Sequence, residues 1–325
     1  MNEANGNIPS QAPPVAILSH RTAMSYYRTL DPTHPKAAHA TKAFPFDQAS
    51  ASSELLSTFN AGYSGFGGAP IDLLVPDPSL IRKTKKLIAH SCECELPGNS
   101  FWKLNDTLYI SSPEFCFVQM AQSMSIPQLV ELGVNLCSSY YVDTKTGDLP
   151  EREPITTPTK LANFAKRAKG LRGVKKAKEA LKWVVVGSRS PMETKLFVIL
   201  CYPLSRGGYG FKICELNPHI DPGRYAYLTE QGYFHIDLCW VKDHTGAEYY
   251  GDNDHLNNVV HDRRRLDALG TLGWHMVVID KQRLYDPEAF DIAAKQLAGY
   301  LNYRIRKGEG WQEAHTALRK DLGLL

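Results

Sequence analysis

The sequence lacks a long apolar segment and a basic leader. No window approaches the ~20 consecutive apolar residues that a membrane-spanning helix needs. Residues 1–14 contain Asn, Pro, Gln and Gly without the positive start and apolar run of a signal peptide, and we interpret them as a disordered lead-in. The sequence therefore predicts a soluble, cytoplasmic protein without a membrane partner.

Cysteines are few and irregularly spaced. Seven of them, an odd number, lie between Cys92 and Cys239, which excludes the even framework of a small secreted domain and predicts reduced thiols. Cys92 and Cys94 are separated by one residue, whereas structural zinc sites use pairs separated by about two to four residues. We therefore expect no zinc. The glycines between 62 and 68 also lack the spacing of a nucleotide-binding loop.

The charge balance is weak overall but uneven along the chain. The formal net charge of +3 is too small to indicate a nucleic-acid partner by itself. Between Lys166 and Lys182, however, basic side chains greatly outnumber the single acid, Glu179. This stretch is either a solvated helix face or a surface that contacts phosphates. In the second case Lys175 and Lys176 are candidate nucleic-acid contacts.

A chain of 325 residues is long enough for about two domains. We place an N-terminal α+β domain at 15–150, a linker with a basic helix at 151–189, a second domain at 190–305 and a C-terminal tail at 306–325. In the first domain, apolar spacing predicts one helix over 15–30, strands at 71–75 and 108–110, and helices that begin at 113 and 127.

The second domain has the most regular pattern. Ser190 followed by Pro191 predicts the start of a helix, because Ser is a good N-cap and Pro suits the first helical position. Strands are predicted at 211–214, 233–241 and 247–251, with Gly246 as the turn between the last two. A helix that ends at Gly273, a strand at 274–279 and a helix at 287–304 complete the order. This order predicts an α/β fold with a mixed central sheet flanked by helices.

Two acids in the predicted hairpin suggest a chemical role. Asp237 interrupts an apolar strand and Glu248 lies on the neighbouring strand, where opposed side chains come within ~5 Å of each other. Two carboxylates on rigid strands suit a hard cation such as Mg²⁺, and Glu193 could add a third oxygen ligand. In the alternative interpretation, Asp237 is at the exposed edge of a half-buried strand and Glu248 is a surface acid.

Several short motifs occur in order along this part of the chain: Ser190-Pro191-Met192-Glu193, His235-Ile236-Asp237-Leu238-Cys239-Trp240, Glu248-Tyr249-Tyr250-Gly251, His255, Asp262 to Arg265, and Leu269 through Gly273-Trp274. They resemble the PD-(D/E)XK nuclease superfamily, in particular its very-short-patch-repair (Vsr)-like branch. The resemblance implies a Mg²⁺- or Mn²⁺-dependent endonuclease that hydrolyses phosphodiester bonds in DNA, with the metal held by Glu193, Asp237 and Glu248.

The chain departs from this family at Tyr250, where the superfamily usually has Lys and this branch often has Asp. Tyr250 shares a strand face with Glu248 and is expected in the site, but a phenol of pKa ~10 is a poor base at neutral pH. His255 is either a catalytic residue or a helix-entry residue at the surface. Arg263, Arg264 and Arg265 either hold a phosphate or pair with surface acids.

Two short segments of the N-terminal part carry a second resemblance: Ala16-Ile17-Leu18-Ser19-His20-Arg21-Thr22-Ala23 and Leu108-Tyr109-Ile110-Ser111-Ser112-Pro113-Glu114. They resemble AbiEi-type antitoxins and transcriptional regulators. The resemblance implies DNA binding in a toxin–antitoxin or phage-defence setting, with a toxin or other protein as a further partner. It also supplies the alternative function, a catalytically inactive nuclease fold that acts as a regulator.

Overall fold

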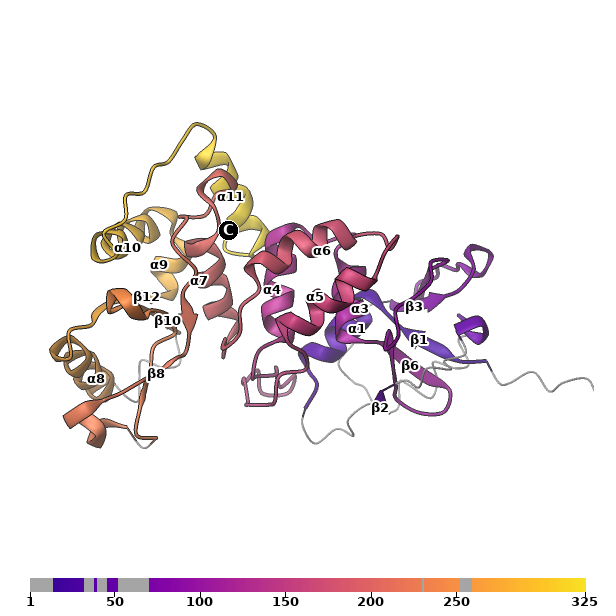
Figure 1. Ribbon diagram of the computed structural model, residues 1–325, viewed down its shortest axis with the longest axis horizontal. Helices are drawn as coiled ribbons and strands as arrows, with labels where there is room; N and C mark the ends of the chain where they lie inside the picture. Colours follow the sequence, from indigo (N-terminus) through magenta and orange to yellow (C-terminus); the bar gives the residue numbers. More distant parts are fainter. Residues whose placement is uncertain (1–13, 32–37, 40–45, 52–69, 230, 252–258) are drawn as a thin grey trace, which may run out of the picture.

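The computed structural model describes residues 14–31, 38–39, 46–51, 70–229, 231–251 and 259–325. It is a mixed α/β protein in which one sheet belongs to the N-terminal half and another to the C-terminal half, with helices between them (Figure 1). The predicted fold class is confirmed. The predicted lead-in at 1–14 and the glycines at 62–68 lie outside the described residues, apart from residue 14.

The N-terminal sheet joins strands that are distant in the sequence. Its order is β2-β5-β6-β1-β3-β4, with β1 parallel to β6 and β3 parallel to β4. The central strands are fully buried because their residues are almost all apolar. The bounds are β1 (Ala16–Leu18), β2 (Ala38–His39), β3 (Ile71–Val75), β4 (Leu87–Ser91), β5 (Phe101–Lys103) and β6 (Leu108–Ser111).

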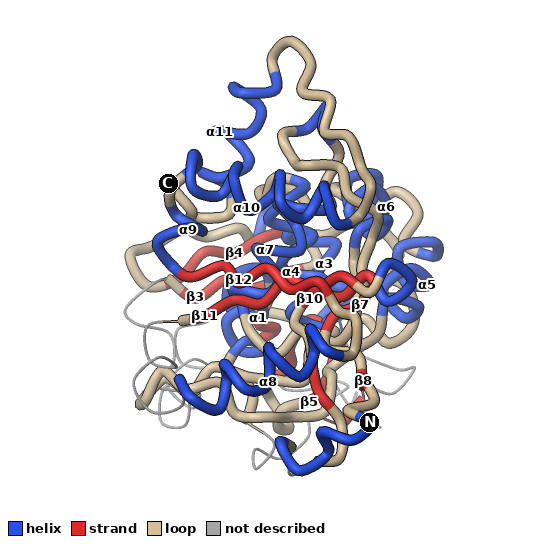
Figure 2. The backbone as a smooth tube through the Cα atoms, turned by 90° about the vertical axis from the view of Figure 1, so that its left-hand side faces the viewer, coloured by secondary structure: helices blue, strands red, loops and turns tan. Residues whose placement is uncertain are grey.

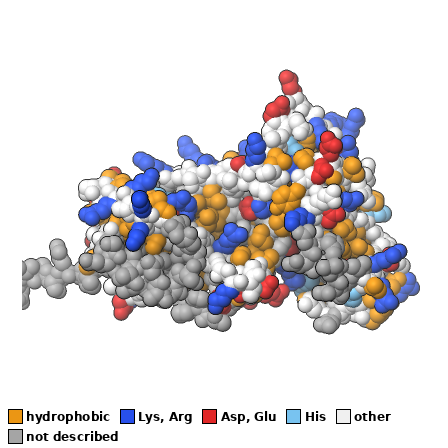
Figure 3. Space-filling model, turned by 180° about the vertical axis from the view of Figure 1, so that it is seen from behind, with side chains coloured by type: hydrophobic (Ala, Val, Ile, Leu, Met, Phe, Trp, Pro, Cys, Tyr) orange, Lys and Arg blue, Asp and Glu red, His pale blue; other side chains and the backbone are white. Residues whose placement is uncertain are grey.

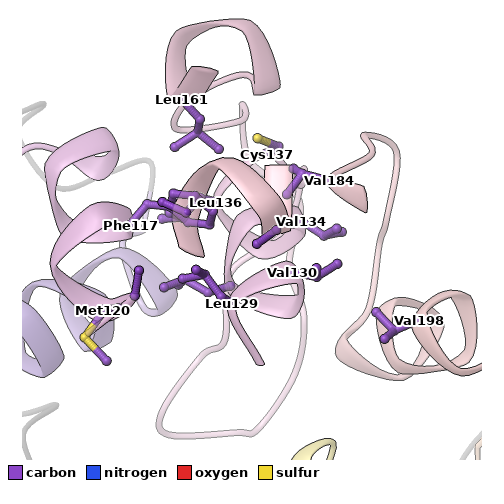
Figure 4. Packing of buried hydrophobic residues seen from close by; sticks show 14 of the residues in the cluster. Phe117, Met120, Leu129, Val130, Val134, Leu136, Cys137, Leu161, Val184 and Val198 are labelled. Carbon is purple, nitrogen blue, oxygen red and sulfur yellow. The ribbon is translucent and has the colours of Figure 1, made fainter. Parts of the chain in front are cut away.

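Helices cover this sheet and link it to the C-terminal half. Helix α4 is buried along most of its length and packs against α6 on one side and α7 on the other. Figure 4 shows its Leu129 and Val134 among Phe117, Met120 and Val184. The bounds are α1 (His20–Arg28), α3 (Pro113–Met120), α4 (Ile126–Leu136), α5 (Pro158–Arg167), α6 (Val174–Ala180) and α7 (Pro191–Cys201).

The C-terminal sheet has the order β12-β11-β10-β7. Strands β7, β10 and β11 are antiparallel, whereas β12 runs parallel to β11 after the crossover helix α8. A separate pair, β8 and β9, lies beside it. The bounds are β7 (Glu215–Leu216), β8 (His219–Ile220), β9 (Phe234–His235), β10 (Leu238–Trp240), β11 (Thr245–Tyr250), α8 (Val259–Thr271), β12 (His275–Asp280), α9 (Lys281–Tyr285), α10 (Pro287–Tyr300) and α11 (Trp311–Asp321).

The two faces of this sheet bury different apolar sets. Val277 and Ile279 of β12 face α10 and belong to the large core, which also contains α4, α7 and the N-terminal sheet. Ala268 and Leu269 of α8 pack with Ile236 in a smaller cluster on the other side. Figure 2 shows α8 and α10 on opposite sides of the strands. The large core is therefore continuous between the two halves.

Three sequence predictions of local structure were wrong. The segment 15–30 is not one helix, because the consecutive apolar residues of β1 form a fully buried strand. Ser19, the N-cap of α1, separates this strand from the helix, whose first residue, His20, has φ 45°. The strand predicted at 233–241 is broken at Ile236 and Asp237, so that it forms β9 and β10. Gly246 lies inside β11; the turn before it is the 3-10 segment Val241–Asp243 followed by His244.

Further segments also differ from the sequence predictions. The region 151–189 contains the helices α5 and α6, and both are packed on the core rather than forming one basic helix in a linker. The strand expected at 211–214 begins only at Glu215. The predicted tail contains α11, whose Trp311 and Leu318 are buried. Within the described ranges, no helix combines the length and apolar character needed to cross a membrane.

Candidate active site

The start of α7 holds Glu193 in a buried position. The hydroxyl of Ser190 caps this helix by accepting a hydrogen bond from the Glu193 backbone N–H at 3.1 Å. The Glu193 carboxylate is only 7% exposed, and its Oε2 accepts a hydrogen bond from the Arg189 backbone N–H at 2.8 Å. The sequence prediction of the cap was correct, and the cap fixes the carboxylate at the helix N-terminus.

Asn217 connects Glu193 to the strand that carries Asp237. Its side-chain amide donates to Glu193 Oε2 at 2.7 Å and to the Gly187 carbonyl at 3.0 Å. Its backbone N–H lies 3.2 Å from the Asp237 carbonyl oxygen. Asn217 has φ 49°, a left-handed conformation that Asn tolerates better than most residues. Sequence reasoning missed this residue; an Asn followed by Pro218 is a turn signal but does not indicate a contact with α7.

Asp237 lies at the break between β9 and β10. The pairing of β10 with β11 ends at Leu238 and Ala247. Continuing the same register by one residue places Asp237 opposite Glu248, as the sequence predicted for this hairpin. Asp237 Oδ2 accepts a hydrogen bond from the Tyr249 backbone N–H at 2.8 Å. The side chain therefore satisfies a backbone donor of the neighbouring strand instead of extending into solvent.

The three predicted acids influence one another electrostatically. Burial raises the pKa of Asp237 well above its usual range, and the carboxylates of Glu193 and Glu248 raise it further. Burial also raises the pKa of Glu193, although its hydrogen bonds oppose the shift. Carboxylates from α7, from the break before β10 and from β11 thus lie close enough to interact in a region of low solvent access. Perturbed acids of this kind are concentrated at functional sites.

Arg265 of α8 neutralises Glu248. Its guanidinium donates two hydrogen bonds to this carboxylate, from Nη1 to Oε2 at 2.9 Å and from Nη2 to Oε1 at 2.6 Å. Nη2 also donates to the His235 carbonyl. Glu248 is 3% exposed and the Arg265 side chain 19%, so this is a largely buried, bidentate ion pair. Sequence reasoning offered phosphate or a surface acid for the Arg263–Arg265 run and did not consider Glu248 as the partner.

Tyr250 follows Glu248 by two residues and enters the same region. Burial raises the pKa of its phenol, and the nearby carboxylates of Glu248 and Asp262 raise it further. The phenol is therefore protonated at neutral pH and is a poorer base than an exposed tyrosine. His255, the other predicted catalytic residue, lies outside the described residues.

The remaining predicted basic contacts are spread over the molecule. Arg263 and Arg264 are exposed on α8, the helix that carries Arg265. Lys175 is exposed on α6 in the other half, where Lys176 donates to the Met124 carbonyl at 2.9 Å. Figure 3 shows Lys and Arg side chains over both halves of one face. The predicted lysines and arginines therefore belong to two separate surfaces.

An opening of about 690 Å³ lies beside the ion pair. It is lined by Arg265 and His235 from the site and by Phe234, Tyr233 and Tyr227 from the β9 region. Tyr227 is 78% exposed, so the aromatic lining extends outward from the carboxylates. The opening has the size of a pocket for an organic ligand or for part of a polymer.

The carboxylates suit Mg²⁺ or Mn²⁺ in chemistry, because both ions prefer oxygen ligands. Their arrangement is not that of a complete ligand set. Among the described residues, no three or more His, Cys, Asp or Glu side chains are grouped closely enough to hold a metal ion. Both oxygens of Glu248 are bound by Arg265. Metal binding by Glu248 therefore requires release of the arginine.

Comparison with known proteins finds no matching family model, no matching curated protein and no matching solved structure. The assignment of a function therefore rests on the side chains and their geometry.

Proposed function

We propose that the C-terminal half is a Mg²⁺- or Mn²⁺-dependent phosphodiester hydrolase that acts on DNA. The observation that carries the proposal is that three acids from separate elements lie close enough to interact: loss of solvent raises the pKa of the half-buried Asp237, and the carboxylates of Glu193 and Glu248 raise it further. A buried cluster of this kind is costly unless a cation or a proton neutralises it. A divalent cation is the ligand that relieves most of this repulsion.

The residues of the chain have distinct roles in this proposal. Asp237 and Glu193 would hold the ion, and Glu248 would contribute only if Arg265 released it. A bound cation supplies a Lewis acid and activates water for attack on phosphate. Arg265, once released, is a bidentate donor placed next to the opening and suits the phosphate of the substrate. Asn217 acts as a positioning residue, because it orients Glu193.

Activity on plasmid DNA tests the proposal. We expect Mg²⁺-dependent nicking or cleavage by the intact protein, and its loss in Asp237→Asn and Glu193→Gln, which preserve shape but remove charge. Asp267→Asn, on the exposed part of α8, is the matched control and retains activity. Cleavage that survives both acid substitutions contradicts the assignment. A parallel assay on RNA of the same sequence decides between the two nucleic acids.

A second candidate function is a DNA- or protein-binding regulator that keeps the fold without hydrolysis, as in an AbiEi-like antitoxin. The Arg265–Glu248 ion pair favours it, because an internal cation already neutralises Glu248 where a metal is expected. Tyr250 favours it too, because a protonated phenol stands where the nuclease superfamily usually has Lys or Asp. Calorimetric titration with Mn²⁺ separates the two functions: saturable binding that Asp237→Asn abolishes supports the hydrolase, and no binding together with DNA retention supports the regulator.

A further inference from the structure

A second polar cavity lies in the N-terminal half, remote in the fold from the carboxylates. It has a volume of about 330 Å³ and lies between β4, α3 and the loop before α6. Its apolar wall includes Leu74, Phe115 and Leu171. Its polar lining includes His20, His90, Gln119, Gln122 and Arg172. The size suits a small organic molecule rather than a bare ion.

A buried acid fixes the two imidazoles of this cavity. Asp72 is 1% exposed and binds His90 Nε2 at 2.7 Å and Arg21 Nε at 3.2 Å. These hydrogen bonds lower the pKa of Asp72, although burial alone works in the opposite direction. His20 stacks on His90 with a centroid distance of 3.8 Å. Because Asp72 is already paired with the guanidinium of Arg21, it adds little negative charge to the cavity.

His20 and Gln119 are held in an unusual arrangement. His20 has φ 45°, a left-handed conformation that non-glycine residues seldom adopt and that is concentrated at functional sites. Its backbone N–H donates to Gln119 Oε1 at 3.3 Å, which orients the amide. Gln119 is 3% exposed, and its Nε2 has no hydrogen-bond partner within the described part of the chain. Buried donors of this kind are rare and indicate a ligand or water.

Two donors of the lining suit an anion. Among the described lining residues, Arg172 and Glu93 carry opposite charges and both are exposed at the rim. Lys169 and Lys175, near Arg172 in the sequence, and Glu95, near Glu93, are exposed as well. The cavity therefore combines the unpaired amide of the buried Gln119 with a guanidinium at the entrance. A group with several acceptor oxygens matches this arrangement.

We propose that this cavity binds a phosphate monoester, with the Gln119 amide and the Arg172 guanidinium as donors and the organic part of the ligand against the apolar wall. The phosphate can belong to a free nucleotide or to the 5′ end of a nucleic-acid strand. Both sources present the same terminal phosphate to the same donors. The proposal is independent of hydrolysis at the carboxylates, because it shares no residue with that site.

Calorimetric titration of the full chain tests the proposal at constant ionic strength. The ligands are AMP, adenosine, and a short oligonucleotide with either a 5′-phosphate or a 5′-hydroxyl. We expect AMP to bind and adenosine not to bind. A preference for the 5′-phosphorylated oligonucleotide over AMP assigns the site to strand ends, and equal or weaker binding assigns it to free nucleotides.

Two variants separate the cavity from general charge attraction. Gln119→Glu keeps the acceptor for the His20 N–H but removes the donor and adds repulsion. Arg172→Ala removes the guanidinium at an exposed position that the fold does not need. Each is expected to weaken AMP binding at least about tenfold, the effect of one hydrogen bond to a charged group. Arg167→Ala, an exposed arginine at the end of α5, makes the same change in net charge and leaves binding unchanged.

Three results overturn the proposal: equal binding of adenosine and AMP, no binding of any phosphate monoester, or equal losses in Arg172→Ala and Arg167→Ala. If Gln119→Glu does not fold, as judged by circular dichroism, the comparison of the two arginine variants decides the outcome alone.

Discussion

The ion pair between Arg265 and Glu248 gives the sharpest prediction of this structure. Replacing Arg265 with Met keeps the aliphatic part of the side chain and leaves the Glu248 carboxylate, 3% exposed, without its two charged donors. Breaking a buried ion pair from one side costs about 3–5 kcal/mol. Because the Arg265 side chain is 19% exposed, we expect the lower end, about 3 kcal/mol.

This loss can be measured as a change in Tm. An unfolding entropy of roughly 2.1 cal/mol/K per residue over 325 residues converts about 3 kcal/mol into a decrease of about 4 °C. Arg264→Met is the matched control, because this neighbour on α8 is exposed and surface substitutions change stability by about 0.5 kcal/mol at most. Adding Glu248→Gln to Arg265→Met is expected to recover most of the loss, since no charge is then left unpaired.

Magnesium extends the same experiment to the proposed function. Without Arg265, Glu248 is available to a cation, so Mg²⁺ should stabilise Arg265→Met more than the parent protein. At about 100 times its Kd, a ligand adds about 2.7 kcal/mol, which restores most of the lost Tm. Equal Tm values for Arg265→Met and Arg264→Met refute the ion-pair reasoning. Loss of stability without any response to Mg²⁺ contradicts the metal site instead.

Four further substitutions test the acid cluster and other parts of the fold. Asp237→Asn is expected to raise stability at neutral pH: the folded protein raises the pKa of Asp237, so stability falls as pH increases from about 4, its unfolded value, through the folded pKa. In urea unfolding, the free energy of unfolding should therefore decrease less between pH 5 and pH 8 in the variant than in the parent protein. An equal decrease in both proteins contradicts the burial argument. Gly208→Ala places a Cβ 2.0 Å from the Tyr202 carbonyl oxygen and should lower the free energy of unfolding by at least about 3 kcal/mol. At Gly299 a Cβ meets no atom within 4 Å, so Gly299→Ala should stabilise α10 slightly, which thermal unfolding of both variants measures. Tyr27→Phe removes a 2.6 Å hydrogen bond to a buried carbonyl and should lower the unfolding free energy by about 1–2 kcal/mol in urea; a value near zero refutes this role for the hydroxyl.

The sequence predicted the elements whose signals are local. The Ser190 cap and the apolar spacing of α7 were sufficient to place Glu193 near a helix start, and the structure confirms that position. The hairpin also placed Asp237 opposite Glu248, which agrees with the observed register. These features depend on neighbours in the chain or on a short turn. Physical rules for caps and antiparallel pairs therefore describe them well.

Features that depend on distant segments could not be predicted in this way. Arg265 is one of three consecutive arginines, and only the docking of α8 on the sheet selects it, rather than Arg263 or Arg264, as the partner of Glu248. The N-terminal sheet pairs β1 with β6, although about 90 residues separate them. The break at Asp237 also has a tertiary cause, because Ile236 joins the cluster under α8 while Leu238 joins the large core.

Two explanations of the buried acids lead to opposite expectations for stability and activity. If the carboxylates were only structural, each would be satisfied by its own partners: Glu193 by Asn217 and Arg189, Glu248 by Arg265, and Asp237 by the Tyr249 N–H. Asp237 does not fit this explanation, since its single backbone donor does not offset the two acids that raise its pKa. Replacing it should therefore stabilise the protein and abolish metal-dependent activity together. A variant that loses both stability and activity would indicate instead that Asp237 serves the fold.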